Sequence, residues 1–199
     1  MNDTLVWIGV TIVLAVGFHL FFVWRFPYVV MLVVRRVVGS PPNTIIHMPP
    51  TVAEPKTDRR RRRIQLILGA FRTPKGQPTR SVVRPSPDLL YSACIYDVSK
   101  TALRIRAHIP DTYWSISFFA SNTDNYFVTN DRKLGSKDVT FLLVAKGRRV
   151  GNAEGALVVE AQSHRGVILL RALVMDPGAR DDLIRIQKLA TCEPVGQAA

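Results

Sequence analysis

Two groups of polar and aromatic residues in the second half of the chain have the chemistry to bind a polar ligand. Each group mixes carboxylates with an arginine and an aromatic side chain, as suits a glycan or an anionic headgroup. The alternative is structural, because Asn and Asp favour turns by bonding their local backbone. The first group is Arg84, Asp88, Tyr91, Tyr96 and Asp97; the second is Asn122, Asp124, Asn125, Tyr126, Asn130, Asp131 and Arg132; Trp114 lies between them and is a further candidate.

An envelope hydrolase is the alternative to a binding module. Asp97 with Asp124 or Asp131 could supply the two carboxyl groups, which glycosidases place about 5–10 Å apart across one cleft. The chain contains no G-x-S-x-G, H-E-x-x-H, C-x-x-C or Walker motif, and Cys94 has no histidine close in sequence to activate it. We therefore favour a non-catalytic module, with the catalytic alternative left open.

The histidines and cysteines give little support for a metal site. His19, His47 and the two further histidines stand singly, without the spacing of zinc ligands, and residues 121–125 lack the spacing of a calcium loop. We expect neither a metal nor a cofactor. Cys94 and Cys192 could form one disulfide, or they could be two buried thiols.

The residues Leu5 to Trp24 form an uncharged run of twenty that matches the ~30 Å hydrocarbon core of a bilayer. Trp7 and Trp24 lie at its two ends, where aromatic belts occur. The start, Met-Asn-Asp, and the long apolar core favour an uncleaved anchor over a signal peptide. A second apolar run, 26–34, is too short to cross alone, and Pro27 predicts a kink or an end of the first helix. It would then lie in the membrane interface or extend the helix.

The segment 39–80 combines a proline-rich linker with a basic stretch. Five prolines in 40–58 predict an extended spacer that is neither a helix nor a central strand. In 59–72, apolar residues recur at helical spacing after Arg59, Arg60, Arg61, Arg62 and Arg63. This predicts a basic helix, on the membrane surface or on the domain, with the arginines near anionic headgroups.

The positive charge of the chain is concentrated beside the membrane segment. Residues 25–80 carry a net charge of +10, whereas residues 81–199 carry only +3. This distribution favours lipid headgroups as the partner and makes nucleic acid unlikely. A protein partner in the membrane is a further expectation. A basic membrane-surface or nucleic-acid adaptor that works through 59–72 stays as a third functional alternative.

The residues 81–199 predict a mainly β domain. In 103–109, Leu103, Ile105, Ala107 and Ile109 alternate with polar neighbours on one face. Similar short runs follow, separated by turn-rich breaks, which favours an antiparallel sandwich or jelly-roll-like domain. Asp176 as N-cap predicts one C-terminal helix on this core. The predicted organisation is thus a membrane helix with its juxtamembrane segment (1–38), a linker with a basic segment (39–80) and a β domain (81–199).

Two segments carry a resemblance to a known family. VVRPSPDLLYSACIYDVSK (82–100) and DTYWSISFFASNTDNYFVTNDRK (111–133) resemble the domain-of-unknown-function family 1254, and the chain is similar to a small branch of single-span bacterial inner-membrane proteins. The stretch RGVILLRALVMD and the ending Cys-Glu-Pro fit this branch. The resemblance implies a β-rich fold and a bacterial envelope setting but no activity.

Two sets of sequence features favour opposite sides of the membrane for the β domain. The N-terminal tail carries only Asp3, whereas Arg25, Arg35 and Arg36 follow the span, so the positive-inside rule favours the cytoplasm. The two cysteines, the spacer and the envelope setting favour the periplasm, where a disulfide persists. We favour the periplasm and keep the cytoplasm as the alternative.

Overall fold

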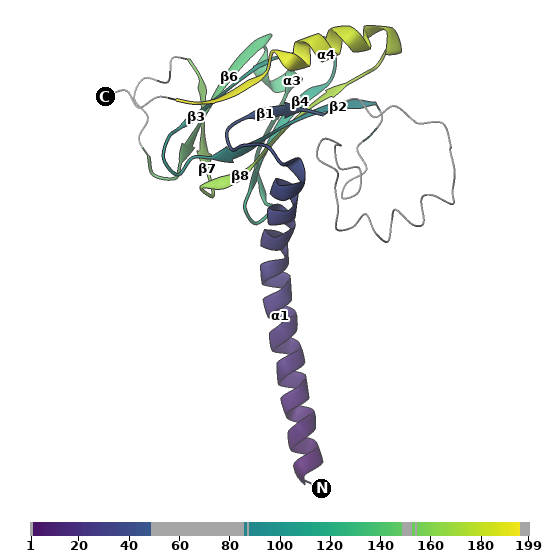
Figure 1. Cartoon of the computed structure of the whole chain (residues 1–199), viewed down its shortest axis with the longest axis vertical. Coiled ribbons are helices and arrows are strands. Elements are labelled where there is room, and N and C mark those ends of the chain that lie inside the picture. The colour runs from purple at the N-terminus through teal and green to yellow at the C-terminus, as the bar shows by residue number, and fades with distance from the viewer. Residues whose placement is uncertain (1, 49–85, 87, 149–152, 154, 196–199) are drawn as a thin grey trace.

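The computed structural model describes residues 2–48, 86, 88–148, 153 and 155–195. The predicted basic segment 59–72 and most of the predicted linker lie outside these ranges. The described chain forms a long N-terminal helix, two β-sheets and a short C-terminal helix (Figure 1). The predicted fold class, a mainly β domain with a C-terminal helix after an N-terminal apolar helix, is confirmed.

Helix α1 runs from Asn2 to Val38 and passes through Pro27. Its stretch from Asp3 to Arg36 is long and apolar enough to cross a bilayer. The expectation that Pro27 could end the helix is wrong, because a proline removes only one main-chain hydrogen bond and apolar helices tolerate that loss. The second apolar run therefore extends the helix.

The strands form two sheets, and almost all neighbours are antiparallel. The larger sheet has the order β1-β2-β8-β4-β5, which are Ile45–His47, Leu89–Asp97, Arg165–Leu173, Trp114–Ala120 and Asn125–Asn130. The smaller sheet has the order β7-β6-β3-β9, which are Leu157–Ala161, Asp138–Ala145, Leu103–His108 and Thr191–Pro194. One pair departs from the predicted antiparallel pattern: β6 and β7 run parallel, which requires the connection between them to return along the sandwich.

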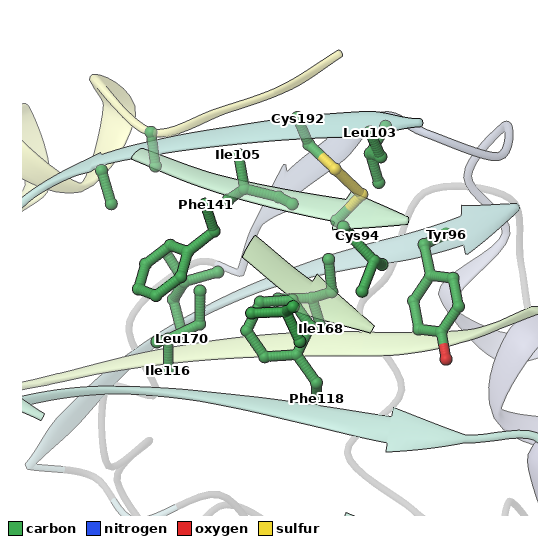
Figure 2. Packing of buried hydrophobic residues seen from close by; sticks show 14 of the residues in the cluster. Cys94, Tyr96, Leu103, Ile105, Ile116, Phe118, Phe141, Ile168, Leu170 and Cys192 are labelled. Carbon is green, nitrogen blue, oxygen red and sulfur yellow. A yellow bond between two sulfur atoms is a disulfide. The ribbon is translucent and has the colours of Figure 1, made fainter. Parts of the chain in front are cut away.

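The core lies between the two sheets (Figure 2). Leu103, Ile105 and Ala107 are buried, as their alternation along β3 predicted. Phe118 of β4 and Phe141 of β6 meet with their ring centroids 5.9 Å apart. Each fully buried side chain of this size contributes roughly 1.5–3 kcal/mol, so this layer supplies much of the stability of the domain.

A disulfide between Cys94 of β2 and Cys192 of β9 joins the two sheets (Figure 2). Both cysteines are buried in the core, and 98 positions separate them in the sequence. Closing so long a loop restricts the unfolded chain and stabilises a domain by about 2–4 kcal/mol. The bond also fixes β9 over the β2 side of the sandwich.

The C-terminal helix begins later than Asp176 suggested. The side chain of Asp176 accepts a hydrogen bond of 2.9 Å from a main-chain N–H in the 3₁₀ turn Pro177–Ala179. Helix α4 then runs over Arg180–Lys188, with Asp181 and Asp182 in its first turn. Those carboxylates lie at the positive end of the helix dipole and stabilise it.

The strand directions give the sandwich two opposite ends. At the joint end, the chain leaves α1 and enters β1, and the β2–β3, β4–β5 and β7–β8 turns lie beside it. At the distal end lie the β3–β4 connection and the short helix α3 (Asp131–Leu134). Helix α4 lies on the side of the domain away from α1 (Figure 1). The two ends carry different polar groups.

Candidate functional site

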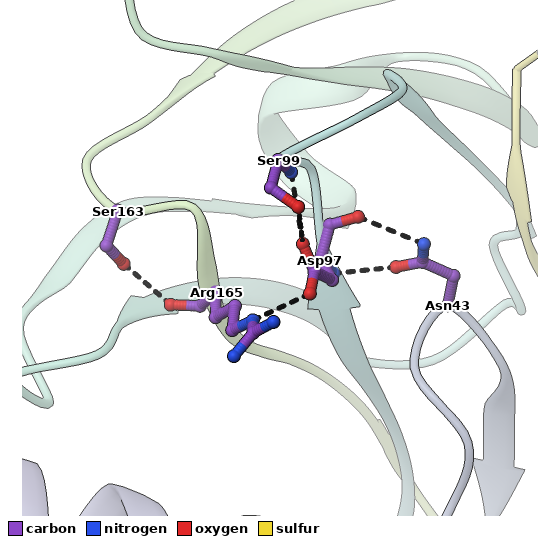
Figure 3. Close-up of polar contacts among 5 residues, drawn as sticks. All are labelled: Asn43, Asp97, Ser99, Ser163 and Arg165. Carbon is purple, nitrogen blue, oxygen red and sulfur yellow. Dashed lines mark hydrogen bonds and ion pairs between the residues drawn. The ribbon is translucent and has the colours of Figure 1, made fainter.

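Asn43 ties the chain after α1 to the end of β2 (Figure 3). Its side-chain amide donates to the main-chain oxygen of Asp97 at 3.0 Å, and its side-chain oxygen accepts from the Asp97 N–H at 2.7 Å. The Asn43 N–H donates to the oxygen of Ile95 at 2.7 Å. Asn43 has a φ of 63°, a left-handed conformation that asparagine adopts more readily than most residues. Three hydrogen bonds of one residue therefore fix the joint.

The carboxylate of Asp97 is held on both oxygens. Oδ1 accepts from the Ser99 N–H at 3.1 Å and from the Ser99 hydroxyl at 2.6 Å, and Oδ2 accepts from Arg165 Nε at 2.6 Å. Burial raises the pKa of Asp97, but the hydrogen bonds from Ser99 and Arg165 outweigh it and hold the pKa below its ordinary value. The main-chain oxygen of Arg165 accepts from the Ser163 hydroxyl at 2.7 Å (Figure 3). These bonds tie the end of β2 to the turn after it and to the start of β8.

Tyr96 and Tyr126 meet inside the sandwich near the joint end. The Tyr126 hydroxyl donates to the Tyr96 hydroxyl at 3.1 Å, and Tyr96 has no exposed surface. Burial raises the pKa of both tyrosines, so they keep their protons near neutral pH. Gly166 makes room for this contact, because a Cβ there would lie 2.0 Å from the Phe119 oxygen and 2.5 Å from the Tyr96 hydroxyl. Tyr96 is a core residue, closed off from solvent.

The distal end carries an open groove of about 470 Å³, which we call the distal groove. It lies between the β3–β4 connection and the segment that leads from α3 into β6. A groove of this size suits a small polar ligand. Its lining residues are Ile109, Pro110, Asp111, Thr112, Tyr113, Asp131, Gly135, Ser136 and Lys137.

The distal groove combines charged groups with an aromatic face. Asp111 and Lys137 form an exposed ion pair, and the hydrogen bond from Lys137 lowers the pKa of Asp111. Oδ1 of Asp131 accepts from the Trp114 N–H at 3.2 Å. Tyr113 keeps 42% of its surface exposed. The groove can therefore hydrogen-bond a polar ligand while the tyrosine ring covers an apolar part of it.

A third polar cluster lies between α4 and the larger sheet. The Ser92 hydroxyl is 3.0 Å from His47 Nδ1 and accepts from the Gln187 amide at 2.9 Å; Gln187 also donates to the Tyr91 oxygen at 2.7 Å. Ser92 therefore links His47 of β1 with Gln187 of α4. Burial, followed by the charge of Lys188, lowers the pKa of His47, which agrees with a neutral ring.

A serine beside a histidine is also found in hydrolase active sites, but here a substrate has no access to the serine. Ser92 is 1% exposed, and the cavity beside it measures about 20 Å³. That volume holds about one water molecule. A substrate carbonyl cannot reach the hydroxyl, so the cluster serves to dock β1 and α4 on β2.

The first predicted group is spread along the whole of β2. Asp88 precedes the strand at the distal end and Asp97 closes it at the joint end, so roughly 30 Å separates them at 3.3 Å per residue. The hydroxyl of Tyr91 accepts from the Ser86 N–H at 3.1 Å. Arg84 lies outside the described residues. The structure does not bring this group together.

The second predicted group divides in the same way across β5. In the β4–β5 turn, Asn122 Oδ1 accepts from the Asp124 N–H at 3.3 Å, the local bonding of the turn alternative. At the other end, Asn130 Oδ1 accepts from the Lys133 N–H at 3.2 Å and caps α3. Asp131 is the predicted residue that lines the distal groove. Of the others, Asn125 and Arg132 are exposed and Trp114 is buried.

The register of the strands also excludes one of the predicted carboxylate pairs. Asp97 lies opposite Arg165 at the start of β8, whereas Asn130, next to Asp131, lies level with Arg171 six positions further on. About 20 Å therefore separates Asp97 from Asp131, well beyond the roughly 5–10 Å of a glycosidase pair. Within the described ranges, no three His, Cys, Asp or Glu residues gather as metal ligands.

Sequence reasoning missed most of the distal groove. Asp111, Thr112 and Tyr113 directly follow a proline between two predicted strands, and such loops frequently carry function. That signal could have found them. Lys137 reaches Asp111 from 26 positions away, and Asn43 reaches Asp97 from 54. No local sequence pattern predicts contacts between residues so far apart in the chain.

The fold and the groove define a two-sheet β domain that carries an apolar N-terminal helix at one end and an open polar groove at the other. The chain belongs to the family described as Protein of unknown function (DUF1254), whose model matches residues 67–194. This confirms the resemblance drawn from the segments 82–100 and 111–133.

Two solved structures are similar to the chain. The VPA0106 protein from Vibrio parahaemolyticus matches with a TM-score of 0.62 at 12% identity, over 88% of this chain and 37% of its own. This likeness supports the fold alone, and the chain spans little more than a third of that protein. An uncharacterized protein from Burkholderia cenocepacia matches with a TM-score of 0.41 at 16% identity, over 62% of this chain and 33% of its own. A comparison with curated proteins finds no match.

Proposed function

We propose that this protein is a non-catalytic envelope module, anchored in a bacterial inner membrane by α1, that holds a polar ligand or a polar segment of a partner protein in the distal groove. The observation that carries the proposal is the groove itself. Asp111, Tyr113 and Lys137 stand open to solvent there, whereas the polar groups at the joint end bond one another. A set of solvent-facing donors, acceptors and one aromatic ring is typical of a binding surface.

The anchor is supported by the side chains at the end of the predicted span. The guanidinium of Arg25 lies 5.7 Å from the Trp24 ring and 5.8 Å from the Tyr28 ring. Tryptophan, tyrosine and arginine favour the headgroup layer, where an apolar body and a polar end are both accommodated. The large apolar side chains from Leu5 to Trp24 are exposed, and a bilayer would cover them.

The disulfide supports a periplasmic position for the domain. A bond between Cys94 and Cys192 persists in an oxidising compartment and is rare in the cytosol. The arginines after the span argue the other way. A reporter enzyme that is active only outside the cytoplasm, fused after Ala199, decides between them. Activity of the fusion supports the periplasm, and a silent fusion with both thiols free in quenched lysate refutes it.

The two alternative functions have less support. In the hydrolase alternative, Asp97 would act as base or nucleophile, but hydrogen bonds from Ser99 and Arg165 lower its pKa and so weaken it in both roles. The adaptor alternative depends on residues 59–72, which lie outside the described residues, so it stays a prediction. The headgroup contacts of the five arginines stay a prediction for the same reason.

Binding in the groove can be tested by NMR. The full chain is placed in detergent micelles, and the amide signals of the β domain are followed while a probe is added. The probes are an N-acetylglucosamine tetrasaccharide, which represents a glycan, and glycerol phosphate, which represents an anionic group. We expect at least one probe to shift the signals of Thr112, Tyr113 and Lys137, and Tyr113→Ala to remove the shift. The matched control, Thr123→Ala in the β4–β5 turn, should leave it intact. Shifts confined to the joint end, or none with either probe, would refute the proposal.

A further inference from the structure

We infer that the ligand of the distal groove is an amino sugar, held by its protonated amino group and by its hydroxyl groups. The inference rests on the proposed function of the groove and narrows it to one class of ligand. Three observations carry it: the hydroxyl side chains of the groove offer a ligand only acceptors, one carboxylate oxygen has no partner, and a half-exposed tyrosine ring lines the same groove.

The two hydroxyl side chains that line the groove direct their protons into the protein. Thr112 donates to the main-chain oxygen of Leu173 at 3.0 Å, and Ser136 donates to that of Asp138 at 2.9 Å. A hydroxyl group has one proton and two acceptor lone pairs, so both side chains are left to accept hydrogen bonds. A ligand that bonds them must therefore supply the donors.

Asp131 offers the groove a charged acceptor. Its Oδ1 accepts from the Trp114 N–H at 3.2 Å, whereas within the described ranges its Oδ2 has no hydrogen-bond partner and its carboxylate forms no ion pair. The other lining carboxylate, Asp111, is paired with Lys137. Hydrogen bonds between two charged groups are roughly twice as strong as neutral ones. Asp131 therefore favours a ligand with a cationic donor over one with neutral donors alone.

Tyr113 gives the groove an aromatic wall. The residue is 42% exposed, and Ile109 and Pro110 line the groove with it. An aromatic face packs against an apolar surface and also attracts a cation. A sugar ring has an apolar C–H face with hydroxyl donors around its rim, and an amino substituent adds the cation. An amino sugar thus matches the ring, the acceptors and the carboxylate together.

The positive charges of α3 lie near the groove without lining it. Arg132 and Lys133 are exposed and are absent from the lining residues. Asp138, the next carboxylate along the chain after Asp131, is paired with His108 at 2.8 Å. The net charge of this end therefore does not select the ligand. The selection depends on direct contact with Asp131, so a change at this one residue can test it.

The test compares three sugars that differ at one ring position. The probes are glucosamine, N-acetylglucosamine and glucose, added to the full chain in micelles at pH 6, where a primary amine is protonated. We expect glucosamine to shift the amide signals of Thr112 and Tyr113 with a Kd at least about fivefold below those of the other two sugars. Equal Kd values for the three sugars would overturn the inference. So would tighter binding of lysine amide, which carries an ammonium group without the sugar ring.

A variant at Asp131 tests the contact itself. Asp131→Asn keeps an acceptor for the Trp114 N–H but removes the charge, so it should raise the Kd of glucosamine to that of glucose. Asp138→Asn is the matched control, because it removes a carboxylate outside the groove and should leave the preference intact. A preference for glucosamine that survives Asp131→Asn would contradict the inference. The comparison of the three sugars on the unaltered chain gives an answer even where the variant folds poorly.

The outcomes also separate this inference from the function on which it rests. Glycerol phosphate or the N-acetylglucosamine tetrasaccharide could shift the signals of the groove while glucosamine shows no preference over glucose. That result would refute the amino sugar and leave the binding module standing. No shift in the groove with any of the probes would refute the proposed function itself.

Discussion

The joint end and the distal end of the sandwich contain similar residue types but use them differently. At the joint end, Asn43, Asp97, Ser99 and Arg165 direct their polar groups at one another and at main-chain atoms. At the distal end, similar types line an open groove and face solvent. The difference shows that a polar cluster can meet a ligand only where the fold leaves it open to solvent.

The largest expected effect concerns the disulfide between the two sheets, which stabilises the whole sandwich and so both of its ends. Replacing Cys94 and Cys192 with serine should lower the free energy of unfolding by about 2–4 kcal/mol, since the long loop is no longer closed. Thermal unfolding of the full chain in micelles measures the loss. Hydrogen exchange should rise at both ends alike. Faster exchange at one end only would show that the two ends are stabilised independently.

A smaller loss is expected from Asn43→Ala, and it should be confined to the joint end. The change removes two side-chain hydrogen bonds, worth about 1 kcal/mol each, and places alanine at a φ of 63°, so we expect about 2–3 kcal/mol in all. Asn43→Gly keeps the bond loss without the backbone strain and should cost less. Asn122→Ala, in an exposed turn, should cost under about 1 kcal/mol. Equal losses of stability in Asn43→Ala and Asn122→Ala would contradict the claim that Asn43 fixes the joint.

The cluster under α4 predicts a loss of stability in acid. Because the pKa of His47 lies below its ordinary value of 6.5, the folded protein binds fewer protons than the unfolded chain between these two values. The contribution of the neutral His47 to the free energy of unfolding is complete above pH 6.5. It declines as the pH falls from 6.5 to the pKa of His47 in the folded protein. Unfolding measured across this range should depend less on pH in His47→Gln. His164→Gln, in the exposed β7–β8 turn, should retain the dependence.

The smallest effect on stability is expected in the distal groove. Asp111→Ala and Tyr113→Ala remove side chains that are exposed or partly exposed, so the midpoint of thermal unfolding should hardly change. Binding of a probe in the groove should be lost in both variants. A large destabilisation by either change would mean that the groove residues are structural, as at the joint end.

The elements of the fold were readable in the sequence because their signals are local. The alternation of Leu103, Ile105 and Ala107 predicted a strand and its buried face, and the apolar run from Leu5 predicted the N-terminal helix. Pro27 does not end the helix, because the remaining hydrogen bonds of a 37-residue apolar helix outweigh the one that a proline removes. The parallel pairing of β6 and β7 has no local signature.

Local sequence patterns are enough to specify the secondary-structure elements, their hydrophobic faces and the concentration of positive charge beside the apolar helix. Which polar residues share a site depends on how the two sheets pack. A strand advances about 3.3 Å per residue, so Asp88 and Asp97, close in sequence, lie at opposite ends of β2. Asp111 and Lys137, 26 positions apart, meet because their two loops reach the same end of the sandwich. Contacts of this kind depend on strand register, which arises from the packing of the two sheets and the disulfide between them.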